Sequence, residues 1–498
     1  MSNSQTEWNW LPSRIFIDCS YTATSGRNSG IERVVRSLQR EMSTQIADYN
    51  QSCVRQQSCV RQPCRDAAST KPSAPTSRAE SQSSIQNVIA TGSRFVALGE
   101  REARWLDRPA AFRANALRCL PSFYRSYATE LCRISASPRL KKWLLPQAGH
   151  LGAFKLPHNV LDRATRGLIY LRGQHVRTQA GDLMILPDAY WGKNCVWQAA
   201  ARARASGAKT AIVVYDLIPL THKEFVGERR HANFKKYLQA VVTHADLILA
   251  ISETVRKQIE ELLPEYSRYV PHPVTVRSFT LGAEFRDENG PIRQDVQELF
   301  LSNSEQNPFL MVATFDPRKN HEFLLDAFEK IWCHGSQEKL CFIGRVGSLC
   351  EPLMRRIEAH PEKNKKLFVY HDISDSELQH CYRHAKGVVF PSIVEGFGLP
   401  IVESLRHRRR TMVSDTPIHR EVGGELCEYF TLASPDPLAH MIASPPKHDR
   451  LLARSDAADI AIPTWQQSAY QVLRHCVDLF ETPTNHSLHD RSSLRRAA

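Results

Sequence analysis

The chain has 498 residues, of which 42% are hydrophobic and 23% charged, so it can form two or three domains that each bury a core. No apolar run approaches the roughly 18–20 residues that span a bilayer, and the N-terminus lacks the pattern of a secretory signal. The thirteen cysteines lack metal-ligand spacing, which favours a reduced, cytoplasmic protein.

The net charge of +13 favours an anionic partner. Because the common nucleic-acid-binding motifs are absent, we expect a phosphorylated substrate and the inner face of the plasma membrane, and no nucleic acid.

A first strand is predicted at Arg14–Asp18, after a short tail of residues 1–13. A polar loop then leads to a helix that opens at Gly30 and carries apolar residues at helical spacing. A strand, a glycine loop and a helix N-terminus are typical of phosphate sites. The G-x-G-x-x-G pattern is missing, so this element alone does not support a dinucleotide fold.

The next stretch has an unusual composition. QSCVRQ occurs twice in tandem over residues 51–62, and sequence rich in Ser, Ala and Pro follows it. We expect a disordered insertion over 50–90. A metal site built from Cys53, Cys59 and Cys64 is the alternative.

Residues 101–150 contain ten basic and three acidic residues, with aromatic side chains between them. Such a stretch can lie on an anionic membrane face. It can equally pack as a helix on the sheet, with its charges in solvent, and both interpretations stay open.

Regular alternation of strands and helices begins near residue 180. Strands are predicted at 183–186, 210–215 and 246–251, and helices at 194–206, 229–243 and 255–263. Polar residues follow the strand ends, among them Asp188, Asp216 and Ser252, and ligands bind open parallel sheets at this edge. We assign 14–275 to an N-terminal domain and the less regular stretch 276–306 to an interdomain linker.

A second series is predicted over 307–460. Its strands are expected at 309–313, 340–344, 367–370, 388–390 and 411–414. Ser374 and Glu377 form a capping box ahead of one helix. A terminal helix over 461–482 and a disordered tail over 483–498 complete the chain.

The stretch GVVFPSIVEGFGLPIVESL, beginning at residue 387, combines a buried strand, a glycine loop and a helix. Gly396 and Gly398 let backbone approach a ligand, and the helix N-terminus attracts an anion. Glu395 and Glu403 bracket the turn and can accept hydrogen bonds from sugar hydroxyls. Together these features indicate a nucleotide sugar. An ordinary turn with two solvated glutamates is the alternative.

The chain resembles the family 4 retaining glycosyltransferases (glycosyl transferases group 1) in the order of its motifs. They are FLMVATFDPRKNHEFLLDAF (309–328), HDISDSELQHCYRHAKGVVFPSIVEGFGLPIVESL (371–405), SDTPIHREVGG (414–424), DLIPL (216–220), ADLILAISET (245–254) and GIERVVRSL (30–38). The resemblance implies an α/β fold of the GT-B type. Two Rossmann-like parallel-sheet domains would face a central cleft, with a C-terminal helix crossing back.

The resemblance also implies site residues. Glu395 would contact the donor sugar, while Arg318 and Lys319 would neutralise the diphosphate, and these three are the expected catalytic residues. The expected donor-binding residues are Glu403, on the ribose hydroxyls, with Gly396, Phe397, Gly398, Leu399, Thr314 and Gly344. No metal or other cofactor is implied, because the basic pair takes the place of a metal.

On the acceptor side we expect Gly30, Tyr215 and Asp216. Many relatives carry a histidine where this chain has Tyr215. The segment Arg406–Arg410 also departs from the family, which has a small, glycine-containing segment there, and it either binds the membrane or is solvated.

The expected function is retaining transfer of a hexose, mannose from GDP-mannose, from a nucleotide sugar to a lipid-linked or oligosaccharide acceptor. The expected setting is bacterial O-antigen or exopolysaccharide biosynthesis. The alternatives are a non-catalytic nucleotide-sugar-binding protein and a nucleotide-sugar epimerase on the same fold. The intact motif residues argue against both.

Overall fold

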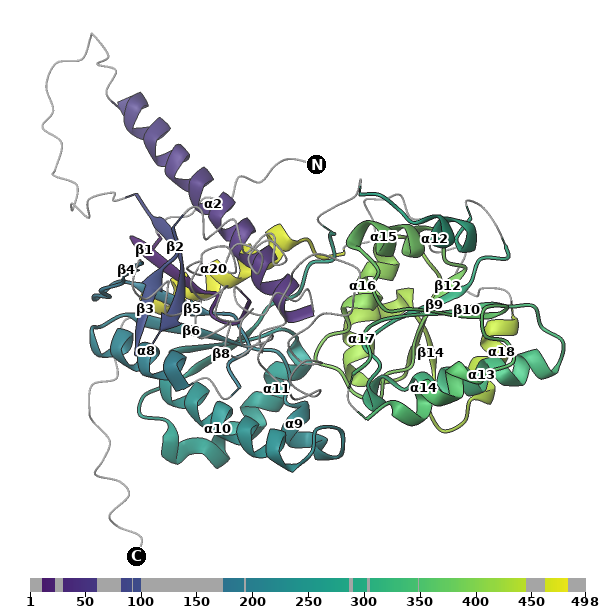
Figure 1. The fold of residues 1–498 in the computed structure, drawn as a ribbon. Coiled ribbons are helices and arrows are strands. Elements are labelled where there is room, and N and C mark those ends of the chain that lie inside the picture. Colours follow the sequence, from purple (N-terminus) through teal and green to yellow (C-terminus); the bar gives the residue numbers. More distant parts are fainter. Residues whose placement is uncertain are drawn as a thin grey trace, which may run out of the picture.

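Two α/β domains lie side by side in the computed structural model (Figure 1). The structure describes residues 11–22, 30–60, 82–91, 93–99, 173–191, 194–285, 290–301, 305–347, 349–444 and 462–481. The predicted basic stretch 101–150 and the predicted tail 483–498 lie outside the described residues.

The N-terminal domain is built on an eight-stranded sheet with the order β4-β3-β2-β1-β5-β6-β7-β8. Its strands are β1 (Arg14–Asp18), β2 (Ser84–Thr91), β3 (Arg94–Ala97), β4 (Gln174–His175), β5 (Leu183–Leu186), β6 (Lys209–Val214), β7 (Leu247–Ala250) and β8 (Thr275–Ser278). Pairing is parallel from β2 to β8. The predicted parallel-sheet domain is confirmed, and strand β3 alone among these strands runs antiparallel to its neighbours β2 and β4.

Helices cover both faces of this sheet. They are α2 (Gly30–Val60), α8 (Asn194–Ala205), α9 (Ile218–Thr221), η1 (Lys223–Phe225), α10 (Glu228–His244), α11 (Glu253–Leu262) and η2 (Leu263–Tyr269). One core packs Leu38 of α2 against the sheet, and the other packs Trp197 of α8 with Phe234 of α10. The predicted cap of α11 is confirmed, since Ser252 accepts a hydrogen bond from the Val255 amide.

The expected disordered insertion over 50–90 is wrong at both ends. The helix α2 continues to Val60, and the strand β2 begins at Ser84. Strand β2 alternates exposed and half-buried residues in its first half, so its apolar pattern is weak in the sequence. The expected tail is also too long, because Leu11 is buried in the core.

The C-terminal domain contains a six-stranded, all-parallel sheet with the order β11-β10-β9-β12-β13-β14. Its strands are β9 (Phe309–Val312), β10 (Leu340–Ile343), β11 (Leu367–Tyr370), β12 (Gly387–Phe390), β13 (Thr411–Ser414) and β14 (Glu428–Phe430). The first five confirm predicted strands, whereas the three-residue β14 was not predicted.

Helices again lie on both faces. They are α12 (Gln294–Leu299), η3 (Pro317–Lys319), α13 (His321–Cys333), α14 (Glu351–Glu358), α15 (Asp375–His384), α16 (Leu399–Arg406), α17 (Pro417–Gly423), η4 (Gly424–Leu426) and α18 (Asp436–Ala443). The capping box predicted at Ser374 and Glu377 is present at the start of α15. Phe328 of α13 and Tyr382 of α15 belong to cores on opposite faces of the sheet.

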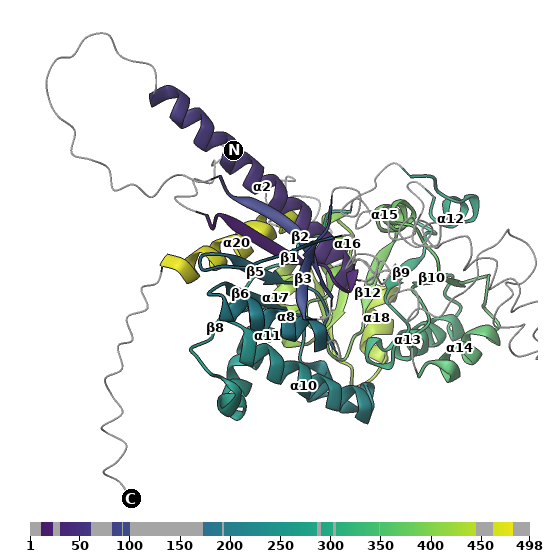
Figure 2. The ribbon, with the colours of Figure 1, turned by 60° about the vertical axis from the view of Figure 1, so that its left-hand side comes forward.

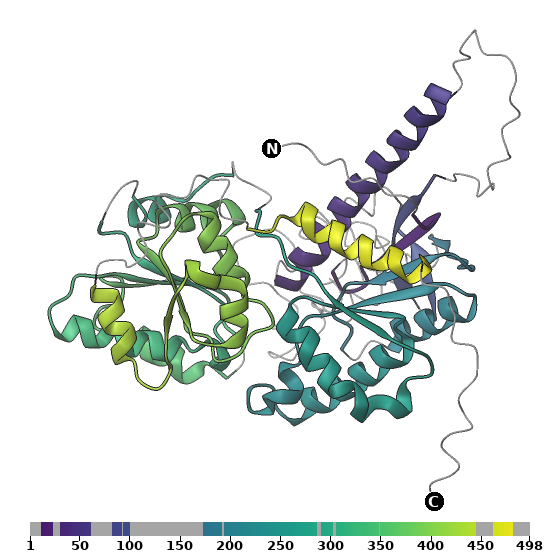
Figure 3. The ribbon, with the colours of Figure 1, turned by 180° about the vertical axis from the view of Figure 1, so that it is seen from behind.

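The linker is shorter than the expected 276–306. Residues up to Ser278 pair in β8, and Leu281 is buried in the N-terminal core, whereas Val296 of α12 is buried in the C-terminal core. A terminal helix, α20 (Trp465–Glu481), confirms the predicted one and returns to the N-terminal domain, where it packs beside α2 (Figures 1 and 3).

The helix α2 runs past the edge of its own domain, as the turned view shows (Figure 2). None of the helices in the described ranges has both the length and the apolar character that crossing a bilayer requires.

Candidate functional site

The turn between β12 and α16 carries the predicted donor loop. Gly398 has φ 98° and is the N-terminal cap of α16, a left-handed backbone that glycine adopts without a Cβ penalty. At the start of α16, Pro400 has no N–H and the Ile401 amide donates to the Gly398 carbonyl, which leaves the Leu399 amide nearest to the loop. The loop is thus built for close approach of an anion or a hydroxyl-bearing ligand.

Glu395 lies between the two predicted cations. Its Oε2 is 3.0 Å from Arg318 Nη1, and its Oε1 contacts Lys319 Nζ. Both cations belong to η3, which follows the carboxyl end of β9, next to β12 in the sheet. Asp316 begins this turn by accepting a hydrogen bond from the Arg318 amide. Neighbouring strand ends therefore bring the three expected catalytic residues together.

Electrostatics keep Glu395 ionised. Burial favours its neutral form, but the charges of Lys319 and Arg318 outweigh burial and hold the pKa of Glu395 at about 2. Burial in turn lowers the pKa of Lys319, although Glu395 opposes this. For Arg318, burial favours deprotonation, but Glu395 and Asp216 raise its pKa above the usual value. Asp316 also lies 3.7 Å from Arg318 Nε, so two cations and two carboxylates meet at this point.

The N-terminal domain meets this loop at the end of β6. A Cβ added at Gly396 would overlap the carbonyl oxygen of Tyr215, so backbone from the two domains touches there. Burial raises the pKa of Asp216, and the charge of Arg318 opposes the rise. The structure thus brings Tyr215 and Asp216, predicted on the acceptor side, to the donor loop.

The Tyr215 side chain points back into its own domain. Its hydroxyl donates to the Pro187 carbonyl at 2.5 Å. The next residue, Asp188, accepts hydrogen bonds from the amides of Tyr21 and Thr22, both at 2.7 Å, while burial raises its pKa to about 7. These contacts fix the carboxyl ends of β1 and β5 beside β6.

Glu403 is buried and already has two partners. Its Oε1 is 2.7 Å from Nη2 of Arg33, on α2 of the other domain. Its Oε2 accepts a hydrogen bond of 2.7 Å from the Tyr382 hydroxyl. The guanidinium of Arg33 also lies over the Phe285 ring, 5.2 Å from its centroid. The proposed contact with ribose would therefore share Glu403 with Arg33.

The remaining predicted residues fall near the same interface or on the adjoining strand ends. Phe397 is buried in the core that α2 and α20 share, and Leu399 packs against that core. A Cβ added at Gly30 would lie 3.8 Å from Cδ1 of Leu399. Thr314 and Gly344 lie together after β9 and β10, since a Cβ at Gly344 would overlap the Ala313 carbonyl. No contact recorded for the described residues joins this pair to Glu395.

Three residues were not predicted for the site, and two of them lie where the domains meet. Ser252 Oγ donates to the Gly396 carbonyl at 2.9 Å. Glu421 of α17 accepts from the amides of Glu253 at 2.6 Å and Thr254 at 2.7 Å, at the start of α11. These pairs join distant segments, and only the cap role of Ser252 was visible in the sequence.

His419 is the third such residue. It is buried beside Phe390, with ring centroids 5.4 Å apart, and its Nδ1 lies 2.9 Å from the Ser414 carbonyl oxygen. Burial lowers its pKa, and the charges of Glu395 and Lys319 also act on it. A neutral imidazole thus lies near Glu395 and Lys319. The motif SDTPIHREVGG contained it, but nothing in the sequence singled it out.

Residues 293–432, which include the cluster and the donor loop, match the family model described as Glycosyl transferases group 1. The chain carries a glycosyl transferases group 1 domain. This match confirms the resemblance that the sequence motifs predicted. The glycosyl transferases group 1 domain coincides with the six-stranded sheet and its loops.

Curated relatives extend the similarity beyond this domain. The chain is 32% identical over 277 residues to the serotype-specific mannosyltransferase WbdA of Escherichia coli, covering 55% of this chain and 34% of that protein. It is 25% identical over 212 residues to the O-antigen chain mannosyltransferase RfbU of Salmonella typhimurium, covering 42% of this chain and 53% of that protein. The chain therefore spans between a third and about half of the length of these relatives.

Among solved structures, the crystal structure of Anabaena HepE in complex with UDP-glucose is similar to this chain, at 12% sequence identity. It covers 94% of this chain and 96% of that chain, with a TM-score of 0.46.

Proposed function

We propose that the chain is a retaining hexosyltransferase. It would move a sugar from a nucleotide diphosphate sugar to a lipid-linked or oligosaccharide acceptor. The observation that carries this proposal is the convergence of Glu395, Arg318 and Lys319 at the point where the N-terminal domain meets the donor loop. The group 1 match over the same residues supports it.

The cluster suits the chemistry of sugar transfer. The bond from the sugar C1 to the diphosphate oxygen breaks, and a bond from C1 to the acceptor oxygen forms on the same face. The acceptor proton leaves with the departing phosphate. Negative charge grows on the diphosphate, where Arg318, Lys319 and the positive end of the α16 dipole would stabilise it. The ionised Glu395 would face the positive charge that develops on the sugar ring.

Mannose from GDP-mannose is the donor that we propose. The support comes from the relatives, since WbdA and RfbU are both named mannosyltransferases. RfbU is named for the O-antigen chain, which supports a bacterial surface polysaccharide as the product. The N-terminal domain would then hold the acceptor beside Asp216, and the C-terminal domain would hold the donor.

A panel of nucleotide sugars tests the proposal. Purified protein is incubated with GDP-mannose, UDP-glucose and UDP-N-acetylglucosamine, with and without bacterial membrane lipids, and nucleotide release is followed by mass spectrometry. We expect release of GDP that depends on the lipids. Nucleotide binding without release from any donor would favour the non-catalytic alternative. A new isomer of the donor with unchanged mass, resolved by liquid chromatography, would favour the epimerase.

A further inference from the structure

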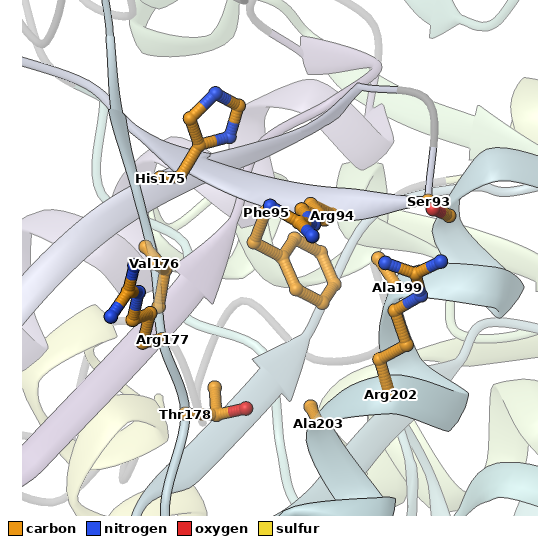
Figure 4. A pocket seen from close by; sticks show the side chains of 10 residues that line it. All are labelled: Ser93, Arg94, Phe95, His175, Val176, Arg177, Thr178, Ala199, Arg202 and Ala203. Atoms are coloured by element: carbon orange, nitrogen blue, oxygen red, sulfur yellow. The ribbon is translucent and has the colours of Figure 1, made fainter.

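A separate hollow of about 490 Å³ lies at the outer edge of the N-terminal sheet. It is enclosed by β3, by the segment that follows β4, and by α8 (Figure 4). Its lining residues are Ser93, Arg94, Phe95, His175, Val176, Arg177, Thr178, Ala199, Arg202 and Ala203. This volume is within the range of pockets that hold small organic ligands.

Three arginines line this hollow. Arg94, Arg177 and Arg202 come from three different segments, and none of the described residues that line the hollow is acidic. None of the three arginines forms an ion pair within the described ranges. Elsewhere in this domain pairing occurs, since Arg14 lies 2.6 Å from Asp182 and Arg204 lies 3.3 Å from Asp246. Like charges around one hollow repel one another, and an anion between them would relieve that repulsion.

The floor of the hollow is apolar. Phe95, Ala199 and Ala203 are buried. In Figure 4 the Phe95 ring lies between Val176 and Ala199, and the Arg202 side chain extends from α8. A guanidinium matches the geometry of phosphate oxygens with two parallel hydrogen bonds. Cations at the rim and an aromatic ring below suit a phosphate that carries an organic group.

The hollow is distinct from the donor site. Strand β3 is separated from β6, the strand that ends at Tyr215, by β2, β1 and β5. Four spacings of about 4.8 Å give roughly 19 Å between β3 and β6 along the sheet. A donor diphosphate at Arg318 therefore cannot also occupy this hollow. A phosphate held here would lie several sugar lengths from the reacting end of an acceptor.

We propose that Arg94 and Arg202 form a binding site for an organic phosphate ester on the N-terminal domain. A ligand bound there keeps its phosphate at the sheet edge and its apolar part on Phe95. The phosphate of a lipid-linked acceptor and the headgroup of an anionic membrane lipid share this chemistry. Neither occupant depends on the identity of the donor sugar.

The test measures binding by the full chain with GDP present in excess, so that the donor site is occupied. Farnesyl phosphate is titrated by calorimetry, and phosphatidylglycerol vesicles are assayed by co-sedimentation against phosphatidylcholine vesicles. The variant is Arg94→Gln with Arg202→Gln. The matched control is Arg229→Gln with Lys235→Gln, which removes two exposed cations from α10.

We expect the double variant to lose at least about tenfold in affinity for one of the two probes while the control keeps wild-type affinity. Each tenfold loss corresponds to about 1.4 kcal/mol. Loss for farnesyl phosphate identifies an acceptor phosphate, and loss for the vesicles alone identifies a membrane headgroup. Unchanged affinity for both probes, or an equal loss in the control, would overturn the proposal. Because no sugar transfer is measured, these outcomes do not depend on the proposed enzyme activity.

Discussion

Arg33 of α2 and Glu403 of α16 form an ion pair of 2.7 Å that joins the two domains. The exposed fractions of their side chains are 22% and 2%, so the pair is largely shielded from water. The Tyr382 hydroxyl, in the same domain as Glu403, donates a hydrogen bond to the other carboxylate oxygen. A residue expected to bind the donor is therefore also a contact between the domains.

Replacing Arg33 by Met should destabilise the chain, because it leaves the Glu403 carboxylate buried with one partner fewer. Removing one member of a buried pair costs about 3–5 kcal/mol. The double variant Arg33→Met with Glu403→Gln should lose less than the sum of the two single changes, which urea denaturation can measure. Strict additivity would show that the pair contributes no coupling energy.

Substitutions in this ion pair should also alter nucleotide binding. Glu403→Gln should weaken GDP binding if this carboxylate accepts ribose hydroxyls, as calorimetry can determine. Arg33→Lys keeps the charge and should retain more affinity than Arg33→Met. Equal GDP affinity in the wild type and all three variants would remove Glu403 from the donor site.

The lowered pKa of Glu395 predicts how the free energy of unfolding depends on pH. Its pKa of about 2 is lower than that of an unfolded glutamate, about 4.3, so the folded state binds fewer protons between these values. The stabilisation is therefore present above about pH 4.3 and is lost as the pH falls through about 2. Glu395→Gln should flatten the fall in unfolding free energy below about pH 5, and Glu425→Gln, at an exposed acid, should not. An unchanged slope in Glu395→Gln would contradict this pKa assignment.

Gly396 and Gly344 should respond differently to substitution by alanine. The added methyl group at Gly396 would overlap Tyr215 in the other domain, whereas at Gly344 it would overlap Ala313 in the same domain. Gly396→Ala should increase the radius of gyration measured by small-angle X-ray scattering, with little change in circular dichroism. Gly344→Ala should instead lower the melting temperature. A Gly396→Ala variant with wild-type dimensions would show that this contact does not hold the domains together.

Glu421 caps a helix of the opposite domain. Glu421→Ala should cost about 0.5–2 kcal/mol, the usual loss for an N-terminal cap, because the amides of Glu253 and Thr254 lose their acceptor. Glu425→Ala, at an exposed residue nearby, is the matched control. Thermal denaturation of both variants checks the difference. Equal melting temperatures would mean that water replaces Glu421 at no cost.

The sequence was informative where local chemistry decides the structure. Buried runs such as Leu183–Leu186 predicted the parallel strands, and the glycines of the donor loop predicted its turn. Strand β2 was missed because polar residues fill its first half, so tertiary pairing rather than apolar pattern defines it. Glu395 and Arg318 could be predicted to lie together because both belong to motifs of the family and follow neighbouring strands.

Contacts between the domains could not be predicted in this way. Arg33 and Glu403 are 370 positions apart in the sequence, and no local pattern indicates that a surface of α2 meets α16. The same holds for Glu421 and the start of α11. Tyr215 was identified by its position after β6, but its orientation toward Pro187 depends on how β5 and β6 pair.

The most direct test of the proposed transfer compares GDP release from GDP-mannose by the wild-type chain and by Glu395→Ala, each with membrane lipids. The account predicts release by the wild type and a loss of about 100-fold or more in the variant, on the scale of removing one preorganised electrostatic group. Circular dichroism should show that the variant stays folded. Release by Glu395→Ala at nearly the wild-type rate would contradict the central assignment.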